Sequence, residues 1–170
     1  TFLNLHLRAQ LLWNPDTDID ALLADFYPRF YGPAAEPMQK YWSAIYTAWE
    51  ETICTEHEYF VAPLIYTPDL IARLGTHLQA AEQRIASLQV QGRVLTRNEH
   101  LFAKRMAFTR LSFDILSNYI AMTTAAATDG DYQAAVIAGE RGLKAREQMA
   151  SMGGMFTSTK LERGYPWWPG

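Results

Sequence analysis

The sequence predicts an all-α fold, an irregular bundle of about six helices with a long central helix and a non-helical, aromatic C-terminal tail. Apolar residues recur at helical spacing in six separate segments. Proline, glycine and short polar residues that cap helices separate these segments, and none of them shows a convincing strand pattern. With 49% hydrophobic and 19% charged residues among 170, the composition suits a globular core rather than disorder.

The first two predicted helices are delimited by proline and glycine. The first covers roughly residues 3–13 and ends at Asn14, because a residue before proline avoids the helical conformation. Asp18 is the expected N-cap of the second helix, since its carboxylate can accept from the first backbone N–H groups. Pro28 is expected to kink or shorten that helix near its end, and Gly32 ends it.

The next two predicted helices are separated by an irregular aromatic stretch, residues 55–66. The third helix begins within residues 34–37 and ends at about Thr52. Its apolar stripe consists of Met38, Tyr41, Trp42, Ile45, Trp49 and Ile53. Thr67 and Pro68 are typical of an N-cap and the first residue of a helix. The stripe of this fourth helix consists of Leu70, Leu74, Leu78, Ala81, Ile85 and Leu88.

The fifth predicted helix, residues 98–126, is the long central one. Thr96 and Glu99 form a capping box before it, in which each side chain satisfies an unpaired backbone N–H group. Two apolar stripes run along it, and a helix that is apolar on two sides is usually central to a bundle. The stripes consist of Phe102, Met106, Phe113, Leu116 and Ile120, and of Leu101, Phe108, Leu111, Ile115 and Met122.

The last predicted helix follows a turn at residues 129–131 and ends at about Ser151. We expect its inner side to consist of Tyr132, Ala135, Val136, Gly139, Gly142, Leu143 and Met149. Glycine within a helix costs roughly 1 kcal/mol relative to alanine, so Gly139 and Gly142 indicate a close approach of another helix. The helical pattern stops at residue 153.

Composition argues against several classes of partner. The net charge is −3 and no block of Lys or Arg stands out, so we expect no nucleic-acid binding. No apolar run approaches the roughly 20 residues that span a bilayer, so we expect no membrane insertion. The single cysteine, Cys54, excludes an internal disulfide, and its apolar surroundings favour an inert thiol over a nucleophile.

The sequence carries no strong catalytic or metal-binding motif, so we predict no metal site, no cofactor and no catalytic residue. The four histidines fit neither the H-E-x-x-H nor the Glu-x-x-His pattern. Glu56 and His57 are neighbours in the aromatic stretch and could act as an acid/base pair. A polar loop tip is the favoured interpretation of that pair, because adjacency alone sets no geometry.

The tail holds the best candidate ligand-binding residues, because aromatic faces stack on sugar rings and basic groups pair with carboxylates. These residues are Lys160, Arg163, Tyr165, Trp167 and Trp168. The favoured alternative is that the same aromatic side chains dock on a neighbouring domain, because Trp is mostly buried in folded proteins.

Two segments carry a resemblance to a known family. "LHLRAQLLWNPDTDIDALLADFYPRFYGPAAEPMQKYW" and, more weakly, "YTPDLIARLGTHLQAAEQRI" resemble the helical region of bacterial proteins grouped as domain of unknown function 4838. The strong part of the signature covers residues 9–38 and includes LLWNPD, ALL and YGPAAEPM. The resemblance extends to about residue 120.

The resemblance implies a helical accessory domain that follows and buttresses the catalytic (β/α)8 barrel of a multi-domain glycosidase, of the α-glucuronidase and hexosaminidase type. Residues 1–14 would be the last barrel helix or the connection from it, 15–152 the helical domain, and 153–170 an aromatic tail or linker. The partner would then be the upstream barrel, with carbohydrate as a second one. The first helix should be poorly buried within this chain, its barrel-facing residues being Phe2, Leu5, Leu11, Leu12 and Trp13.

Two other functions stay open. One is a free-standing helical interaction module of the tetratricopeptide type, although the sequence shows no repeat of the required period. The other is an independent enzyme that uses Glu56 and His57. The sequence leaves open the compartment, with a secreted or periplasmic parent as one expectation, and whether the tail makes a homo-oligomer contact.

Overall fold

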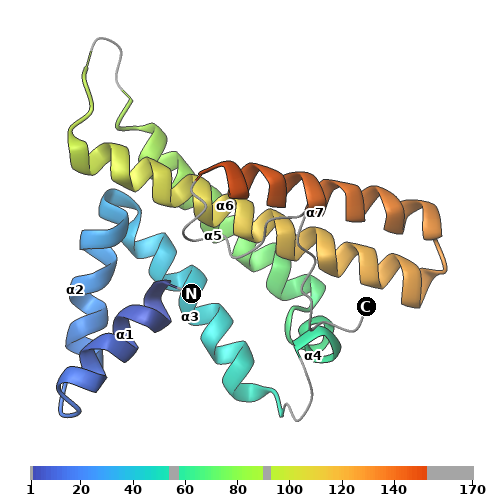
Figure 1. Ribbon diagram of the computed structural model, residues 1–170, viewed down its shortest axis with the longest axis horizontal. Helices are drawn as coiled ribbons and strands as arrows, with labels where there is room; N and C mark the ends of the chain where they lie inside the picture. The colour runs from blue at the N-terminus through green and yellow to red at the C-terminus, as the bar shows by residue number, and fades with distance from the viewer. Residues whose placement is uncertain (1, 54–57, 90–92, 153–170) are drawn as a thin grey trace.

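The computed structural model describes residues 2–53, 58–89 and 93–152, and these residues form helices and connections without any strand. Figure 1 shows their arrangement. The α-helices are α1 (Phe2–Trp13), α2 (Ile19–Tyr31), α3 (Ala35–Glu51), α4 (Glu58–Ile65), α5 (Pro68–Ala86), α6 (Arg97–Thr124) and α7 (Tyr132–Met152). A 3-10 turn, η1 (Gly32–Ala34), precedes α3, and a π-helical turn, η2 (Ala125–Asp129), ends α6. The all-α prediction is confirmed, whereas the tail predicted as non-helical lies outside the described residues.

All six predicted helices are present, and α4 is an addition that the sequence did not predict. This short helix lies in the stretch expected to be irregular and contains Pro63. Val61 and Ile65, one helical turn apart, are buried. Because short helices depend on tertiary packing rather than on propensity, local sequence gives little sign of α4. Pro28 also has less effect than expected, since α2 continues past it to Tyr31.

Local capping explains where the helices begin. The Asp18 carboxylate accepts from the Ala21 backbone N–H at 3.0 Å, and the Thr67 hydroxyl accepts from Leu70 at 3.3 Å. Thr96 and Glu99 form both hydrogen bonds of the predicted capping box. These three predictions are confirmed, because a cap depends only on residues within one turn of the helix.

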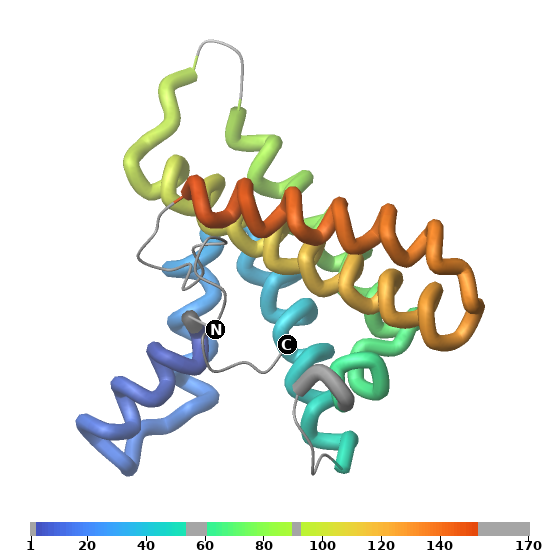
Figure 2. Tube along the Cα trace, turned by 45° about the vertical axis from the view of Figure 1, so that its right-hand side comes forward, coloured from blue at the N-terminus to red at the C-terminus, as the bar shows by residue number. Residues whose placement is uncertain are grey.

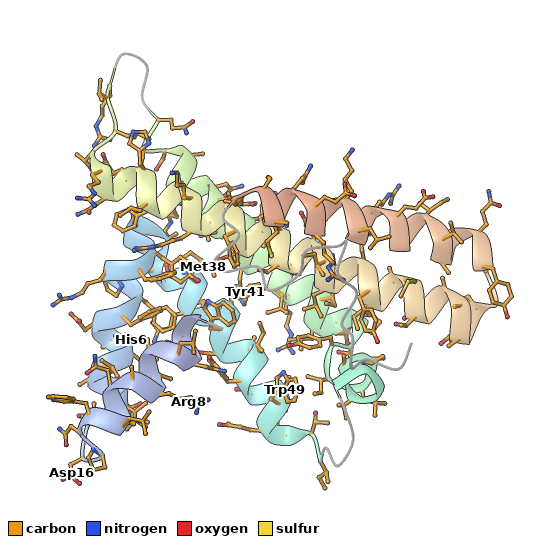
Figure 3. The ribbon with its side chains drawn as sticks, viewed as in Figure 1. His6, Arg8, Asp16, Met38, Tyr41 and Trp49 are labelled. Atoms are coloured by element: carbon orange, nitrogen blue, oxygen red, sulfur yellow. The ribbon has the colours of Figure 1, made fainter. Side chains whose placement is uncertain are left out.

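The largest buried cluster, here called the aromatic core, lies where α2, α3, α5 and α6 meet (Figure 3). Its fully or nearly fully buried members are Leu3, Phe26, Tyr27, Tyr31, Ala34, Met38, Tyr41, Ile45, Leu70, Leu74, Leu78, Ala81, Ile85, Met106 and Phe113. The α5 stripe is thus confirmed as far as Ile85. The α3 stripe is wrong at its end, because Trp49 is exposed and Ile53 lies beyond the last helical residue.

α6 is the central helix that the two stripes predicted, because it contacts α2, α4, α5 and α7. Its N-terminal half belongs to the aromatic core through Met106 and Phe113. Its C-terminal half runs alongside α7, and the turn between them projects away from α1 and α2 (Figures 1 and 2). The first stripe contributes its buried residues, whereas no residue of the second stripe is buried.

Small residues form the α7 side of the interface between α6 and α7. In this α6–α7 interface the buried side chains of α7 are Ala135, Ala138 and Ala145, and Ala125 of η2, which also contacts α7, is buried as well. A Cβ atom added to Gly139 would lie 3.3 Å from the Met122 sulfur, and one added to Gly142 would lie 3.4 Å from Asn118 Cβ. The predicted close approach at both glycines is confirmed.

The predicted inner side of α7 is partly wrong. Tyr132, Val136 and Leu143 are 72%, 60% and 50% exposed. The alanines at 135, 138 and 145 lie on one arc of the helix, and the three larger residues lie on the neighbouring arc. Because alanine permits the closer approach to α6, the narrow alanine arc faces α6 and the large apolar residues lie beside it.

Candidate functional site

The residues that the sequence singled out for chemistry lie outside the described residues. This holds for the tail candidates Lys160, Arg163, Tyr165, Trp167 and Trp168, and for Glu56, His57 and Cys54. Their predicted roles stay predictions.

Within the described ranges, no three His, Cys, Asp or Glu side chains form a group that could hold a metal ion. His6, His77 and His100 lie on three different helices, α1, α5 and α6. Over the same ranges, no helix is both long enough and apolar enough to cross a bilayer.

The most prominent feature that lacks a partner in the described residues is an apolar face of α1. Leu5, Leu12 and Trp13 are 65%, 82% and 90% exposed. On a helix these residues and Ala9 fall within one arc of about 100°, which makes them a single face. We call these four residues the α1 face. Isolated exposed leucines are ordinary, but apolar residues gathered on one helical face mark an interaction site.

The opposite side of α1 is fixed to the rest of the protein. Leu3 is 2% exposed and belongs to the aromatic core, against which Leu7 also packs. The Tyr46 hydroxyl of α3 donates to the Asn4 side-chain oxygen at 2.8 Å. On the flank of α1 next to the α1 face, the His6 ring lies 5.3 Å from that of Phe26 on α2, and Arg8 lies on the other flank (Figure 3). These contacts hold the α1 face outward.

The turn after α1 fixes the outer end of this face. The Asn14 side chain accepts from the Asp16 backbone N–H at 3.1 Å, and the Thr17 hydroxyl donates to the Asn14 carbonyl at 2.7 Å. Such side-chain bonds define a turn locally. The NPD stretch therefore sets the direction in which Leu12 and Trp13 are presented, at the end of α1 that Asp16 marks in Figure 3.

The expectation of a poorly buried first helix is confirmed in part. Leu5, Leu12 and Trp13 are exposed as expected, and Leu11 is half-buried. The side chain of Phe2 is outside the described set. Leu12, Trp13 and the turn between α1 and α2 lie within residues 9–38, which carry the strongest part of the family resemblance.

A cluster of charged residues lies between α5 and α6. Arg110 donates through Nε and Nη2 to the Glu82 carboxylate at 2.6 and 2.5 Å, and Arg110 Nη1 lies 3.7 Å from an Asp114 oxygen. The hydrogen bonds to Glu82 raise the pKa of Arg110, while burial raises the pKa of the Asp114 carboxyl. Since Arg110 of α6 donates two hydrogen bonds to Glu82 of α5, this pair is suited to holding α5 against α6.

Comparisons with family models, curated proteins and solved structures found no match to this chain. The family resemblance of residues 9–38 and 66–81 therefore stays a prediction. The exposure of the α1 face is a structural observation that does not depend on it.

Proposed function

We propose that this chain is a helical accessory domain of a multi-domain glycoside hydrolase, and that the α1 face packs against a (β/α)8 barrel of the same protein. The observation that carries the proposal is the exposure of Leu5, Leu12 and Trp13 on one side of a helix whose other side is anchored in the core. The resemblance of residues 9–38 to the barrel-associated helical family supports a barrel as the partner.

The size of the α1 face fits an interface within one protein. Burying a large apolar side chain contributes roughly 1.5–3 kcal/mol, so covering three of them would contribute about 5 kcal/mol or more. The face is held by the Asn4–Tyr46 hydrogen bond and by the NPD turn, so little ordering of α1 would oppose the contact. Carbohydrate chemistry would then reside on the barrel, where glycosidases carry two carboxylates on loops at the ends of the strands.

The test uses the complete reading frame that encodes this chain. In that protein, the triple variant Leu5→Ser/Leu12→Ser/Trp13→Ser should lower the unfolding temperature of the barrel and its activity on aryl glycosides. In the 170-residue chain the same variant should change the free energy of unfolding by less than about 1 kcal/mol, because the three sites are exposed there.

The matched control is Tyr132→Ser/Val136→Ser/Leu143→Ser on α7, since these residues are similarly exposed and apolar. It should leave the barrel unchanged in the complete protein. A reading frame without a barrel would refute the proposal. It would also be refuted if the α1 variant lowered the unfolding temperature and activity of the barrel no more than the α7 variant does.

An interaction module of the tetratricopeptide type is the second candidate. The observation that favours it is the α6–α7 hairpin, in which α7 packs on α6 through alanine and glycine while Tyr132, Val136 and Leu143 of α7 stay exposed. In a solenoid, such a flank would be covered by the next helix pair. The α7 control variant distinguishes the two candidates, because this alternative expects the α7 variant, and not the α1 variant, to destabilise the complete protein.

A further inference from the structure

A second surface feature, independent of the α1 face, is a pocket where α1, α2 and α6 meet. It has a volume of about 330 Å³ and is lined by His6, Asp25, Phe26, Arg29, Phe30 and Arg105. At about 30 Å³ for each water-sized group, it has room for roughly ten such groups. Pockets for small ligands begin at about this volume.

Three neighbouring aromatic rings and a guanidinium line the wall of the pocket. The His6 ring lies 5.3 Å from the Phe26 ring, and the Phe26 ring lies 4.9 Å from that of Phe30 with 18° between their planes. The Arg105 guanidinium lies 4.2 Å from the centre of the Phe30 ring. Aromatic ring edges are electropositive, so any edge that faces the pocket favours an anion.

Arg105 has only part of its hydrogen-bonding capacity in use. Its Nη1 donates to the carbonyls of Phe30 and Arg29 at 2.9 and 3.3 Å, at the C-terminal end of α2. No carboxylate among the described residues pairs with Arg105, and Nε and Nη2 have no hydrogen-bond partner among them. Burial lowers the pKa of this guanidinium, and a half-buried charge is costly without a counter-ion.

The charge of the pocket sets the charge of a fitting ligand. Asp25 accepts from Arg29 Nε at 2.6 Å, so these two exposed groups neutralise each other. Among the Arg and Asp side chains of the lining, two guanidiniums and one carboxylate leave one net positive charge. A singly charged carboxylate balances that charge, whereas a phosphate dianion would exceed it. A guanidinium also matches the planar geometry of a carboxylate.

We propose that this pocket binds a small organic monocarboxylate, which pairs with Arg105 through Nε and Nη2 and lays a compact apolar ring or chain against Phe26 and His6. This site does not depend on the proposed accessory function. The competing explanation gives Arg105 one role only, that of capping the carbonyls at the end of α2. The two explanations differ in what happens when a carboxylate is added or when the competing Asp25 carboxylate is removed.

The experiment titrates the 170-residue chain with benzoate, with its neutral counterpart benzamide and with inorganic phosphate, and follows backbone and arginine Nε–H NMR signals. Benzoate should shift the signals of His6, Phe30 and Arg105 in a saturable way, with a Kd in the millimolar range. Benzamide should bind at least about tenfold more weakly, because it lacks the charge that the guanidinium pairs with. Arg105→Lys should weaken benzoate by about tenfold through loss of the two-bond geometry.

Asp25→Asn is the decisive variant, because it removes the carboxylate that competes for the pocket's positive charge and lies on an exposed part of α2. Benzoate affinity should rise by about threefold, a size typical of an exposed ion pair. Glu36→Gln is the matched control, since Glu36 forms a similar exposed pair with Lys40 at 2.7 Å on α3. It should leave the affinity unchanged.

Three results would overturn the site. The first is the absence of saturable shifts up to about 50 mM benzoate, a concentration well above the expected millimolar Kd. The second is equal behaviour of the Asp25→Asn and Glu36→Gln variants. The third is phosphate binding more tightly than benzoate. If Arg105→Lys fails to fold, because Arg105 also caps α2, the Asp25 and Glu36 variants still decide the question.

Discussion

The aromatic core and the α6–α7 interface are both buried between helices, yet the core is filled mainly by large side chains, whereas α7 contributes mainly alanine and glycine to the interface. In the core, large residues such as Tyr41 and Phe113 from different helices fill the space between the helix axes. In the interface, alanines and two glycines of α7 bring its backbone close to α6. The core is therefore sensitive to removal of volume, and the interface is sensitive to its addition.

Removal of a core side chain should have the largest effect. Phe113 is 8% exposed, its ring lies 6.5 Å from that of Tyr41, and it faces Gly75 on α5. We expect Phe113→Ala to lower the free energy of unfolding by about 3–5 kcal/mol, because it leaves a cavity among rigidly packed groups. Chemical denaturation measures this, with Tyr132→Ala on exposed α7 as the control. Equal midpoints for the two variants would show that the core does not depend on Phe113.

A glycine at the edge of the core should give the next largest effect. Gly32 has φ +57°, which disfavours residues with a side chain, and an added Cβ atom would overlap the Phe102 ring. Gly130 has φ +66°, but nothing lies within 4 Å of its Cβ position. We expect Gly32→Ala to cost about 2–3 kcal/mol, the sum of backbone strain and displacement of Phe102.

Gly130→Ala is the matched substitution at the far end of the molecule, in the turn between α6 and α7. It should cost only about 1–2 kcal/mol, since backbone strain is its sole penalty. Thermal or urea denaturation of both variants measures the difference. If Gly130→Ala costs as much as Gly32→Ala, the contact of Gly32 with Phe102 contributes nothing.

The sequence predicted those features that depend on neighbours along the chain. The caps at Asp18, Thr67 and Thr96 were predicted, because each involves a side chain and a backbone group within one turn. The α5 stripe was predicted because only one side of that helix is apolar. In α7 the same reasoning failed, since large apolar residues and small ones both follow helical spacing, and only the approach of α6 decides which are buried.

The pocket and the charged cluster could not be predicted, because their residues are distant in the sequence. Arg105 bonds to the carbonyl of a residue 75 positions earlier, and Arg110 to a carboxylate 28 positions earlier. Polar residues on helices are usually solvated, so nothing local distinguished Arg105 from its neighbours. The family resemblance, rather than the helical pattern, predicted that apolar residues of α1 would be exposed.

Two glycine substitutions within helices, one beside the aromatic core and one in the α6–α7 interface, compare how much added volume the two regions tolerate. At Gly75 an added Cβ atom would make an ordinary contact of 3.5 Å with the Phe113 ring, whereas at Gly139 it would lie 3.3 Å from the Met122 sulfur. Alanine is favoured over glycine by up to about 1 kcal/mol in a helix. We expect Gly75→Ala to stabilise by about 0.5–1 kcal/mol and Gly139→Ala by less, because Met122 must shift. Urea midpoints would contradict this if Gly139→Ala gained as much as Gly75→Ala.

The smallest expected effect concerns the charged groups beside the core. Arg110 is held by two hydrogen bonds to Glu82 and lies farther from Asp114, at 3.7 Å. Burial raises the pKa of Asp114 above its ordinary value of 3.8 although Arg110 is near. The folded protein therefore holds the Asp114 proton more tightly than the unfolded chain does. Ionised Asp114 disfavours folding at neutral pH, and this penalty disappears as the pH falls below the unfolded-state pKa.

Asp114→Asn should therefore raise the free energy of unfolding at about pH 7, by less than about 0.5 kcal/mol because solvent screens a partly exposed group. At about pH 3, where the unfolded chain is also protonated at this position, the gain should vanish. Glu82→Gln is the control of opposite sign: it removes a charge-assisted pair of hydrogen bonds to Arg110 and should destabilise at neutral pH. Urea denaturation at both pH values measures the two variants. If Asp114→Asn destabilises at neutral pH, the attraction between Arg110 and Asp114 outweighs burial, and Asp114 belongs with Glu82 in holding α5 against α6.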